Sequence, residues 1–203
     1  MYSKYFKRPF DIIGSFCLFI ISLPLIFIII LILFFLNEGK VFFIQERPGL
    51  NLKGFKIIKF KTMNDSKDNN GILLPNKYRL TPIGIFLRKF SLDEIPQLVN
   101  IIKGEMSLIG PRPLLMDYIP FFNDFQKRRQ TVRPGMTGWA QVNGRNAISW
   151  EEKFVLDIWY VEHLSFSLDL KILLLTLIKA IKHEGISHHG DITMPRFSGN
   201  DVK

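Results

Sequence analysis

The first strong pattern along the chain is an apolar run near its start. Residues 12–36 carry no charged side chain, and this length exceeds the roughly 20 apolar residues that a membrane helix needs. Pro24 lies near the middle of the run, where it removes a backbone donor and frees the carbonyl of Ile20. The hydroxyl of Ser22 can bond to backbone groups freed in this way. The run therefore predicts a membrane helix that is kinked or broken near Ser22 and Pro24.

Two topologies fit this run. Basic residues flank it on both sides, so the positive-inside rule favours both ends on the cytoplasmic side, as in a re-entrant helix-break-helix. The alternative is an ordinary kinked helix that crosses the bilayer. A cleaved signal peptide fits poorly, because the run is too long and no small-x-small site follows it. The flanking basic residues are Lys4, Lys7 and Arg8 before the run, and Lys40, Arg47, Lys53 and Lys56 after it.

After the run, the pattern predicts a small hairpin followed by helices. Residues 41–45 and 55–62 read as two short strands around a Pro-Gly turn. Helical signals follow at 83–89, 93–102, 114–129, 149–163 and 168–183. Residues 184–203 lack periodicity and predict a loose C-terminal tail. We therefore expect an α+β fold that is mainly helical, with residues 1–39 as the membrane-embedded segment and residues 40–183 as one domain.

Two of the later helical segments are unusually apolar. Residues 114–125 gather Leu, Met, Tyr and Phe around a proline, and residues 168–183 are apolar apart from one Asp, a few Lys and a closing His. Both segments fit packing in a core. In a chain with a membrane anchor, both also fit amphipathic helices that lie at the membrane interface with their lysines in the headgroups.

The charge of the chain suits an anionic partner. A chain of 203 residues can form one compact domain, or a smaller domain with an appendage. A content of 47% hydrophobic residues is high for a freely soluble protein. A formal charge of +9 and a pI near 9.7 suit nucleic acid, acidic lipid headgroups or a phosphorylated substrate. Cys17 is the only cysteine, so no intrachain disulfide forms.

Two adjacent carboxylates, Asp93 and Glu94, lie in the stretch FSLDEIPQLVN. Ser91 to Glu94 matches a capping box, and acidic residues near a helix start also favour the dipole. Pro96 fits best in the first turn of a helix that has Asp93 as its N-cap. A carboxylate at that position suits a cap, and it equally suits a nucleophile or a metal ligand.

Several cations accompany this carboxylate pair. Arg112 lies between two prolines, so its backbone is already ordered before it meets a phosphate. Arg88 precedes the carboxylates by about one helical turn, and Lys59 and Lys61 share one face of the second strand. Solvated surface charge accounts for any one of these residues. Together with the carboxylates they suit a diphosphate and a bridging divalent ion.

A glycine-rich stretch, RPGMTGWAQVNGRN, forms the third candidate. Its glycines permit tight turns, and Gln141, Asn143 and Arg145 have side chains that can hydrogen-bond a base or a sugar. The stretch matches neither a P-loop nor a Rossmann fingerprint. No zinc-binding spacing exists either, because His188 and His189 are adjacent in the tail.

Taken together, these stretches resemble the bacterial sugar transferase family, the monotopic phosphoglycosyl transferases. The resemblance covers the chain from about Lys4 to Lys182. The short length of the chain and the stretch NGRNAISWEEKF make the chain most similar to small members of the family, which transfer diacetylbacillosamine phosphate in bacterial protein N-glycosylation. The matching stretches, in order, are KFKTM, SLDEIPQL, KGEMSLIGPRP, RPGMTGWAQVNGRN and LDLKILLLT.

The resemblance implies a reaction. A UDP-sugar and polyprenyl (undecaprenyl) phosphate would give a polyprenyl diphosphate sugar and UMP, with Mg²⁺ as the cofactor. Asp93 would be the nucleophile and would contact the metal, and Glu94 would assist it. The phosphate-holding residues would be Lys59, Arg88 and Arg112, and Gln141, Asn143 and Arg145 would complete the substrate site.

The resemblance also implies where the chain works. The family has a re-entrant N-terminal helix with a Ser-Pro break, and it lies on the cytoplasmic face of the bacterial inner membrane among membrane lipids, without nucleic acid. In this chain Leu23 separates Ser22 from Pro24, so the hydrogen bonding at the break differs from the family pattern. The alternative function is a membrane-tethered protein without turnover that binds anionic lipid or nucleic acid through its basic surface. Release of UMP from a UDP-sugar distinguishes the two.

Overall fold

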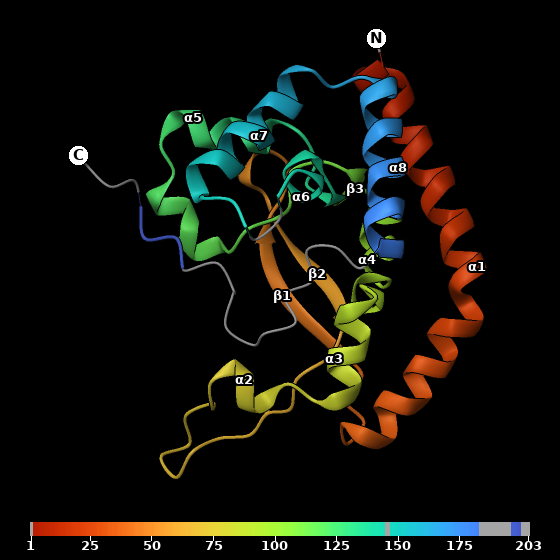
Figure 1. The fold of residues 1–203 in the computed structure, drawn as a ribbon, viewed down its shortest axis with the longest axis vertical. Helices are drawn as coiled ribbons and strands as arrows, with labels where there is room; N and C mark the ends of the chain where they lie inside the picture. Colours follow the sequence, from red (N-terminus) through yellow and green to blue (C-terminus); the bar gives the residue numbers. More distant parts are fainter. Residues whose placement is uncertain (1, 145–146, 183–195, 200–203) are drawn as a thin grey trace.

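The computed structural model describes residues 2–144, 147–182 and 196–199, and within them the fold is mainly helical (Figure 1). The helices are α1 (Lys7–Leu36), α2 (Asn76–Arg79), α3 (Pro82–Lys89), α4 (Gln97–Lys103), α5 (Asp124–Lys127), α6 (Trp139–Val142), α7 (Trp150–Glu162) and α8 (Phe166–Lys182). The strands are β1 (Phe42–Pro48), β2 (Gly54–Phe60), β3 (Ser107–Ile109) and β4 (Gly135–Thr137). Short π or 3₁₀ turns are η1 (Tyr2–Phe6), η2 (Leu50–Leu52), η3 (Leu92–Glu94), η4 (Met116–Phe121) and η5 (Arg128–Thr131).

Strands β1 and β2 form the small antiparallel hairpin that the sequence predicts. Strand β2 contributes to two core clusters, because Phe55 and Ile57 pack into one while Phe60 packs into a second. In β1, by contrast, Phe42, Phe43 and Ile44 are exposed. The face of β2 that carries Lys59 and Lys61 therefore also contributes Ile57 to the core. Ile57 is buried although it alternates in phase with Lys59.

Strands β3 and β4 form a second, parallel pair that the sequence did not reveal. The two backbones approach closely where β3 ends: a Cβ on Gly135 would lie 2.0 Å from the backbone nitrogen of Gly110. Only glycine allows such an approach. This pair carries the chain directly into Arg112.

Helix α1 is continuous through Pro24 and bows along one side of the molecule (Figure 1). The interruption expected near Ser22 and Pro24 is not seen, because the missing donor is accommodated by curvature of the helix. The Ser22 hydroxyl donates to the carbonyl of Phe19 at 3.0 Å rather than to the carbonyl of Ile20. The re-entrant path through a bilayer stays a prediction.

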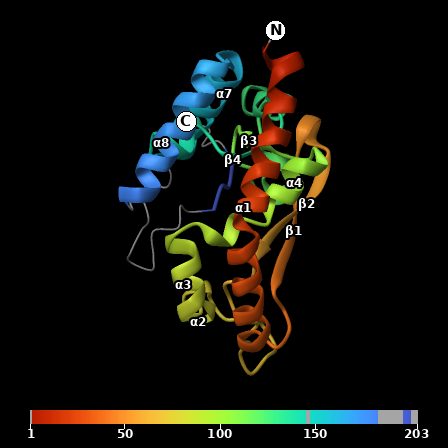
Figure 2. The same ribbon diagram turned by 90° about the vertical axis from the view of Figure 1, so that its right-hand side faces the viewer.

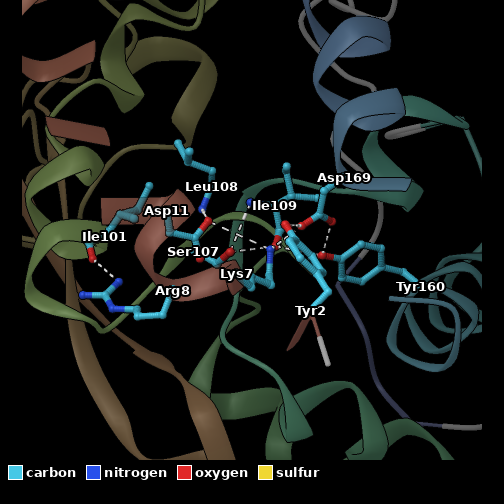
Figure 3. Close-up of polar contacts among 10 residues, drawn as sticks. All are labelled: Tyr2, Lys7, Arg8, Asp11, Ile101, Ser107, Leu108, Ile109, Tyr160 and Asp169. Carbon is cyan, nitrogen blue, oxygen red and sulfur yellow. Dashed lines mark hydrogen bonds and ion pairs between the residues drawn. The ribbon is translucent and has the colours of Figure 1, made fainter. Parts of the chain in front are cut away.

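The start of α1 is fixed by a buried polar network (Figure 3). Lys7 donates to Asp169 of α8 at 2.7 Å, and the hydroxyls of Tyr2 and Tyr160 each donate to the same carboxylate at 2.7 Å. Asp169 is fully buried. The network therefore ties α1, α7 and α8 together at one end of the molecule.

The next turn of α1 contacts α4 and β3. Arg8 donates to the carbonyls of Ile101 and Ile102 at 2.7 and 2.9 Å, where it satisfies the last carbonyls of α4. Asp11 accepts a hydrogen bond from the backbone nitrogen of Leu108 at 3.1 Å. The far end of the helix is also packed, because Ile29 and Leu33 belong to the core cluster around Phe60 and Leu87.

The predicted helix at 149–163 corresponds to α7, which begins at a capping box between Ser149 and Glu152. The predicted helix at 114–129 was wrong. It is divided into η4, α5 and η5, because Asn123 caps a new helix immediately after η4. In the tail, residues 196–199 are not loose: Phe197 is buried in an aromatic cluster, and the other tail residues lie outside the described chain.

Helices α1, α3 and α8 each carry exposed large apolar side chains, and Figure 2 looks onto α1 with α3 and α8 beside it. Helix α8 buries Leu168 and Ile172 on one side while other apolar residues are exposed. Among the described residues, α1 is the one helix that is long and apolar enough to cross a membrane. The exposed residues of α3 and α8 are Ile85, Phe86, Phe166, Leu170, Leu174, Leu177 and Ile178.

We expect Lys7→Met to destabilise the fold by about 3–5 kcal/mol, because it leaves Asp169 as a buried charge without its cation. The measurement is chemical unfolding in mild detergent. The double variant with Asp169→Asn should lose much less than the sum of the single variants. Lys127→Met, which removes an exposed ion pair with Asp124, should change stability by less than about 1 kcal/mol. Equal losses in Lys7→Met and Lys127→Met would contradict the network's role.

Candidate active site

The two carboxylates lie on η3, between α3 and α4. Ser91 has a left-handed φ of 54°, and its side chain makes no capping hydrogen bond. Helix α4 begins at Gln97 after Pro96, also without a side-chain cap. The capping interpretation of Ser91 and Asp93 was therefore wrong. The turn between α3 and α4 therefore positions the two carboxylates, and neither side chain caps a helix.

Glu94 is held between two cations from distant parts of the sequence. It accepts a hydrogen bond from Lys59 of β2 at 2.6 Å and two from Arg112 at 2.5 and 3.3 Å. Burial alone would raise the pKa of Glu94, but the charges and hydrogen bonds of Arg112 and Lys59 outweigh it and hold the pKa well below its usual range. Glu94 therefore stays ionised, and both of its oxygens are occupied.

Asp93 has the opposite environment. It is 8% exposed, and within the part of the chain that the structure describes it makes no hydrogen bond or ion pair. Burial and the negative charge of Glu94 raise the pKa of Asp93, while Lys59, Arg88 and Arg112 oppose the shift. This carboxylate is therefore more basic than usual, and its lone pairs are open to a ligand.

Arg88 completes the cationic side of the site. It lies in the last turn of α3, where its Nε donates to the hydroxyl of Thr62 at 2.9 Å. Burial lowers the pKa of Arg88, and the charges of Asp93 and Glu94 oppose this shift. The guanidinium thus lies near the carboxylates without pairing with either one. The structure brings Lys59, Arg88, Asp93, Glu94 and Arg112 together, as the sequence predicted.

Arg112 is positioned by an ion pair that sequence reasoning missed. Arg129 donates to the backbone carbonyl of Arg112 at 2.7 Å, and it also donates to Asp157 at 2.7 and 3.0 Å. Both partners of this pair are buried. A signal existed in the sequence, because Asp157 lies three residues after Phe154 and directly before Ile158, on the buried face of α7.

The glycine-rich stretch is not joined to this site in the described residues. Gln141 donates to the carbonyl of Met136 at 3.0 Å, and Asn143 donates to the carbonyl of Trp139 at 2.8 Å. No hydrogen bond connects either side chain with Asp93 or Glu94 in the part of the chain described. The Oε1 atom of Gln141 is buried without a partner. Arg145 lies outside the described residues, so its predicted role stays a prediction.

The carboxylates offer limited ligands to a metal. No group of three or more His, Cys, Asp or Glu side chains gathers within the described ranges. Asp93 is the one carboxylate of the pair with unoccupied oxygens, since Lys59 and Arg112 hold Glu94. Mg²⁺ commonly binds one or two carboxylates together with substrate phosphates and water. The site therefore fits a Mg²⁺ ion that Asp93 would hold jointly with a bound phosphate.

Known proteins are similar to this chain over most of its length. The family model described as bacterial sugar transferase matches residues 2–183. An uncharacterized sugar transferase of Bacillus subtilis (strain 168), EpsL, is 51% identical over 96% of this chain and 96% of its own length. The exopolysaccharide production protein ExoY of Rhizobium meliloti (strain 1021) is 35% identical over 84% of this chain and 83% of its own length.

A longer relative is the undecaprenyl-phosphate galactose phosphotransferase of Salmonella typhimurium, which is 34% identical over 90% of this chain but only 42% of its own length. None of these names mentions diacetylbacillosamine, so that sugar stays a prediction. Because the family model covers nearly all of the domain and the similarity to EpsL extends over almost the whole length of both chains, this chain belongs to the bacterial sugar transferase family.

Proposed function

We propose that the chain transfers a sugar-1-phosphate from a UDP-sugar to polyprenyl phosphate, giving a polyprenyl diphosphate sugar and UMP. The family match and a relative named for transfer to undecaprenyl phosphate support a phosphotransferase of this class. The single observation that carries the mechanism is the contrast between two neighbouring carboxylates. Glu94 is clamped by two cations, whereas Asp93 is buried and has no partner among the described residues.

In the first step an oxygen of Asp93 attacks the sugar-bearing phosphorus of the UDP-sugar. The bond from that phosphorus to the UMP oxygen breaks, and UMP leaves with the electron pair. The product is an acyl phosphate between Asp93 and the sugar phosphate. The pKa of Asp93 is raised, so its carboxylate is a better nucleophile than an exposed carboxylate. Arg88 and Arg112 stabilise the charge that develops on the phosphoryl oxygens.

In the second step an oxygen of polyprenyl phosphate attacks the same phosphorus. The acyl phosphate bond breaks, and Asp93 is released as a carboxylate. Two displacements let a water-soluble donor and a lipid acceptor use one site in turn. Mg²⁺, held by Asp93 and the substrate phosphates, would neutralise part of the phosphate charge. Glu94 keeps Lys59 and Arg112 in place throughout both steps.

A membrane location follows from the proposed acceptor. The exposed apolar residues of α1, α3 and α8 suit contact with lipid, with lysines such as Lys171 near the headgroups. We propose that α1 is re-entrant, that α8 is interfacial, and that the site faces the cytoplasmic side of the bacterial inner membrane. Residues 114–125 fit this less well, since Tyr118 and Phe122 are buried in a core cluster.

The central test is covalent capture on Asp93. Incubation with radiolabelled UDP-sugar and Mg²⁺, without lipid acceptor, should release UMP in a burst equal to the amount of enzyme, with the sugar retained on the protein. A panel of UDP-sugars would also identify the donor. Asp93→Asn should give no burst, because the amide is a poor nucleophile.

The same variant serves as its own folding control. Asp93 caps no helix and its charge lies beside that of Glu94, so Asp93→Asn should unfold at or above the wild-type temperature and bind membranes normally. Wild-type turnover in this variant would exclude Asp93 as the nucleophile. Release of UMP only after lipid addition would replace the two-step scheme with direct transfer.

We expect Arg112→Lys to reduce turnover on the order of 100-fold or more, because a point charge replaces a planar donor that reaches both oxygens of Glu94 and a phosphate. Steady-state kinetics with saturating lipid acceptor measure the effect. Arg128→Lys is the matched control, since Arg128 is half-exposed and pairs with Glu162 away from the carboxylates. Similar turnover rates in the two variants would show that Arg112 contributes only general surface charge.

The re-entrant path predicts that both ends of α1 face the cytoplasm. A cysteine introduced at Ser3, in a chain with Cys17→Ser, should stay unlabelled when intact cells are treated with a membrane-impermeant thiol reagent. The same site should be labelled after the cells are opened. Efficient labelling in intact cells would show that α1 crosses the bilayer.

A further inference from the structure

Arg47, near the end of β1, is a partly buried cation that forms no ion pair with Asp93 or Glu94. One terminal nitrogen donates to Gln45 at 2.6 Å and the other makes a long contact of 3.4 Å with the carbonyl of Pro113. The Nε atom is buried and has no hydrogen-bond partner among the residues that the structure describes. Within the described ranges Arg47 forms no ion pair. A guanidinium taken out of water without a countercharge is costly, so its position indicates an anionic ligand.

Arg47 lies beside Arg112, because Pro113 directly follows that residue. Burial and the charge of Arg112 lower the pKa of Arg47 to about 10. Glu94 is already bonded to Lys59 and Arg112, and it makes no ion pair with Arg47 among the described residues. Arg47 is therefore a further cation beside Arg112, and neither Asp93 nor Glu94 is among the groups that shift its pKa.

Lys153 reaches the same region from α7. Its ammonium lies 4.6 Å from the centre of the Trp150 ring, and Trp150 packs edge-on against Tyr118. Burial and the charges of Arg112 and Arg129 lower the pKa of Lys153 to about 8, although Asp157 opposes the shift. Asp157 is itself bound to Arg129. Cations from β1, the segment after β3, and α7 thus lie close enough for the charge of Arg112 to act on both Arg47 and Lys153.

We propose that Arg47 and Lys153, next to Arg112, form the subsite that holds the leaving nucleoside monophosphate. This inference rests on the proposed function, and it gives the orientation of the UDP-sugar in the site. The sugar-bearing phosphate would lie at Asp93 and Arg88, Arg112 would contact both phosphates of the donor, and the nucleoside phosphate would lie at Arg47. When the bond to UMP breaks, the electron pair passes to an oxygen of that phosphate, and Arg47 and Lys153 stabilise the added charge.

This orientation makes the two steps differ. UMP is present in the first displacement and has left before the second, so Arg47 assists only the first. Arg47→Gln should therefore weaken UMP binding by at least 10-fold and slow the UMP burst on the order of 100-fold. Transfer from the isolated sugar-enzyme intermediate to polyprenyl phosphate should keep the wild-type rate. A residue that only stabilises the fold would not separate the two steps.

The experiment uses the full chain in nanodiscs, with UMP as the probe in calorimetric titration and rapid quench for the burst. Lys153→Gln is a second variant, expected to weaken UMP binding in the same direction, and it keeps the test open if Arg47→Gln folds poorly. Arg88→Gln should leave UMP affinity within about twofold, because Arg88 belongs to the other end of the site. Arg128→Gln controls for loss of an exposed positive charge.

Two kinds of failure are distinguishable. If the wild type turns over while both Arg47→Gln and Lys153→Gln bind UMP with wild-type affinity and burst normally, this subsite is wrong and the proposed function stands. If Arg88→Gln weakens UMP binding as much as Arg47→Gln, the orientation is reversed or absent, and the inference fails. If the wild type neither binds UMP nor releases it from any UDP-sugar, the proposed function fails.

Discussion

The candidate site depends on one interaction, the clamp that Lys59 and Arg112 place on Glu94. It joins β2, η3 and the segment after β3, which are far apart in the sequence. One carboxylate thereby satisfies two cations. Its neighbour Asp93 is left buried and basic, with Arg88 nearby. Adjacent residues of the same chemical type thus acquire different roles through their partners alone.

Much of this site could be predicted from the sequence, because its carboxylates and cations lie in short linear stretches. The interpretation of Asp93 as a helix cap failed for a tertiary reason. The left-handed turn at Ser91 directs the carboxylates away from the backbone donors of α4, and no local pattern encodes that. Arg129 was missed because a basic run looks like a solvated surface, whereas its burial depends on Asp157 from α7.

The elements of the fold that could be predicted are likewise those whose signal is local in the sequence. Strong periodic segments such as α7 and α8 and the first hairpin were predicted, since their residues contain the whole signal. The parallel pairing of β3 with β4 was not, because each strand has only three residues and the contact joins distant segments. Helix α1 curves past Pro24 instead of breaking there, and it is packed at both ends, where Lys7 meets Asp169 and Leu33 meets the core. A proline pattern alone does not report that packing.

The buried Phe197 bears on where the folded unit ends. It contacts the rings of Tyr118, Phe122, Trp150 and Phe154, and Arg196 beside it pairs with Asp117. The family match stops at residue 183, before this contact. A protein trimmed to the family boundary would lose the ring that fills this cluster and would expose aromatic surface to water, which favours self-association. The folded unit of this chain therefore extends beyond the residues that the family model matches.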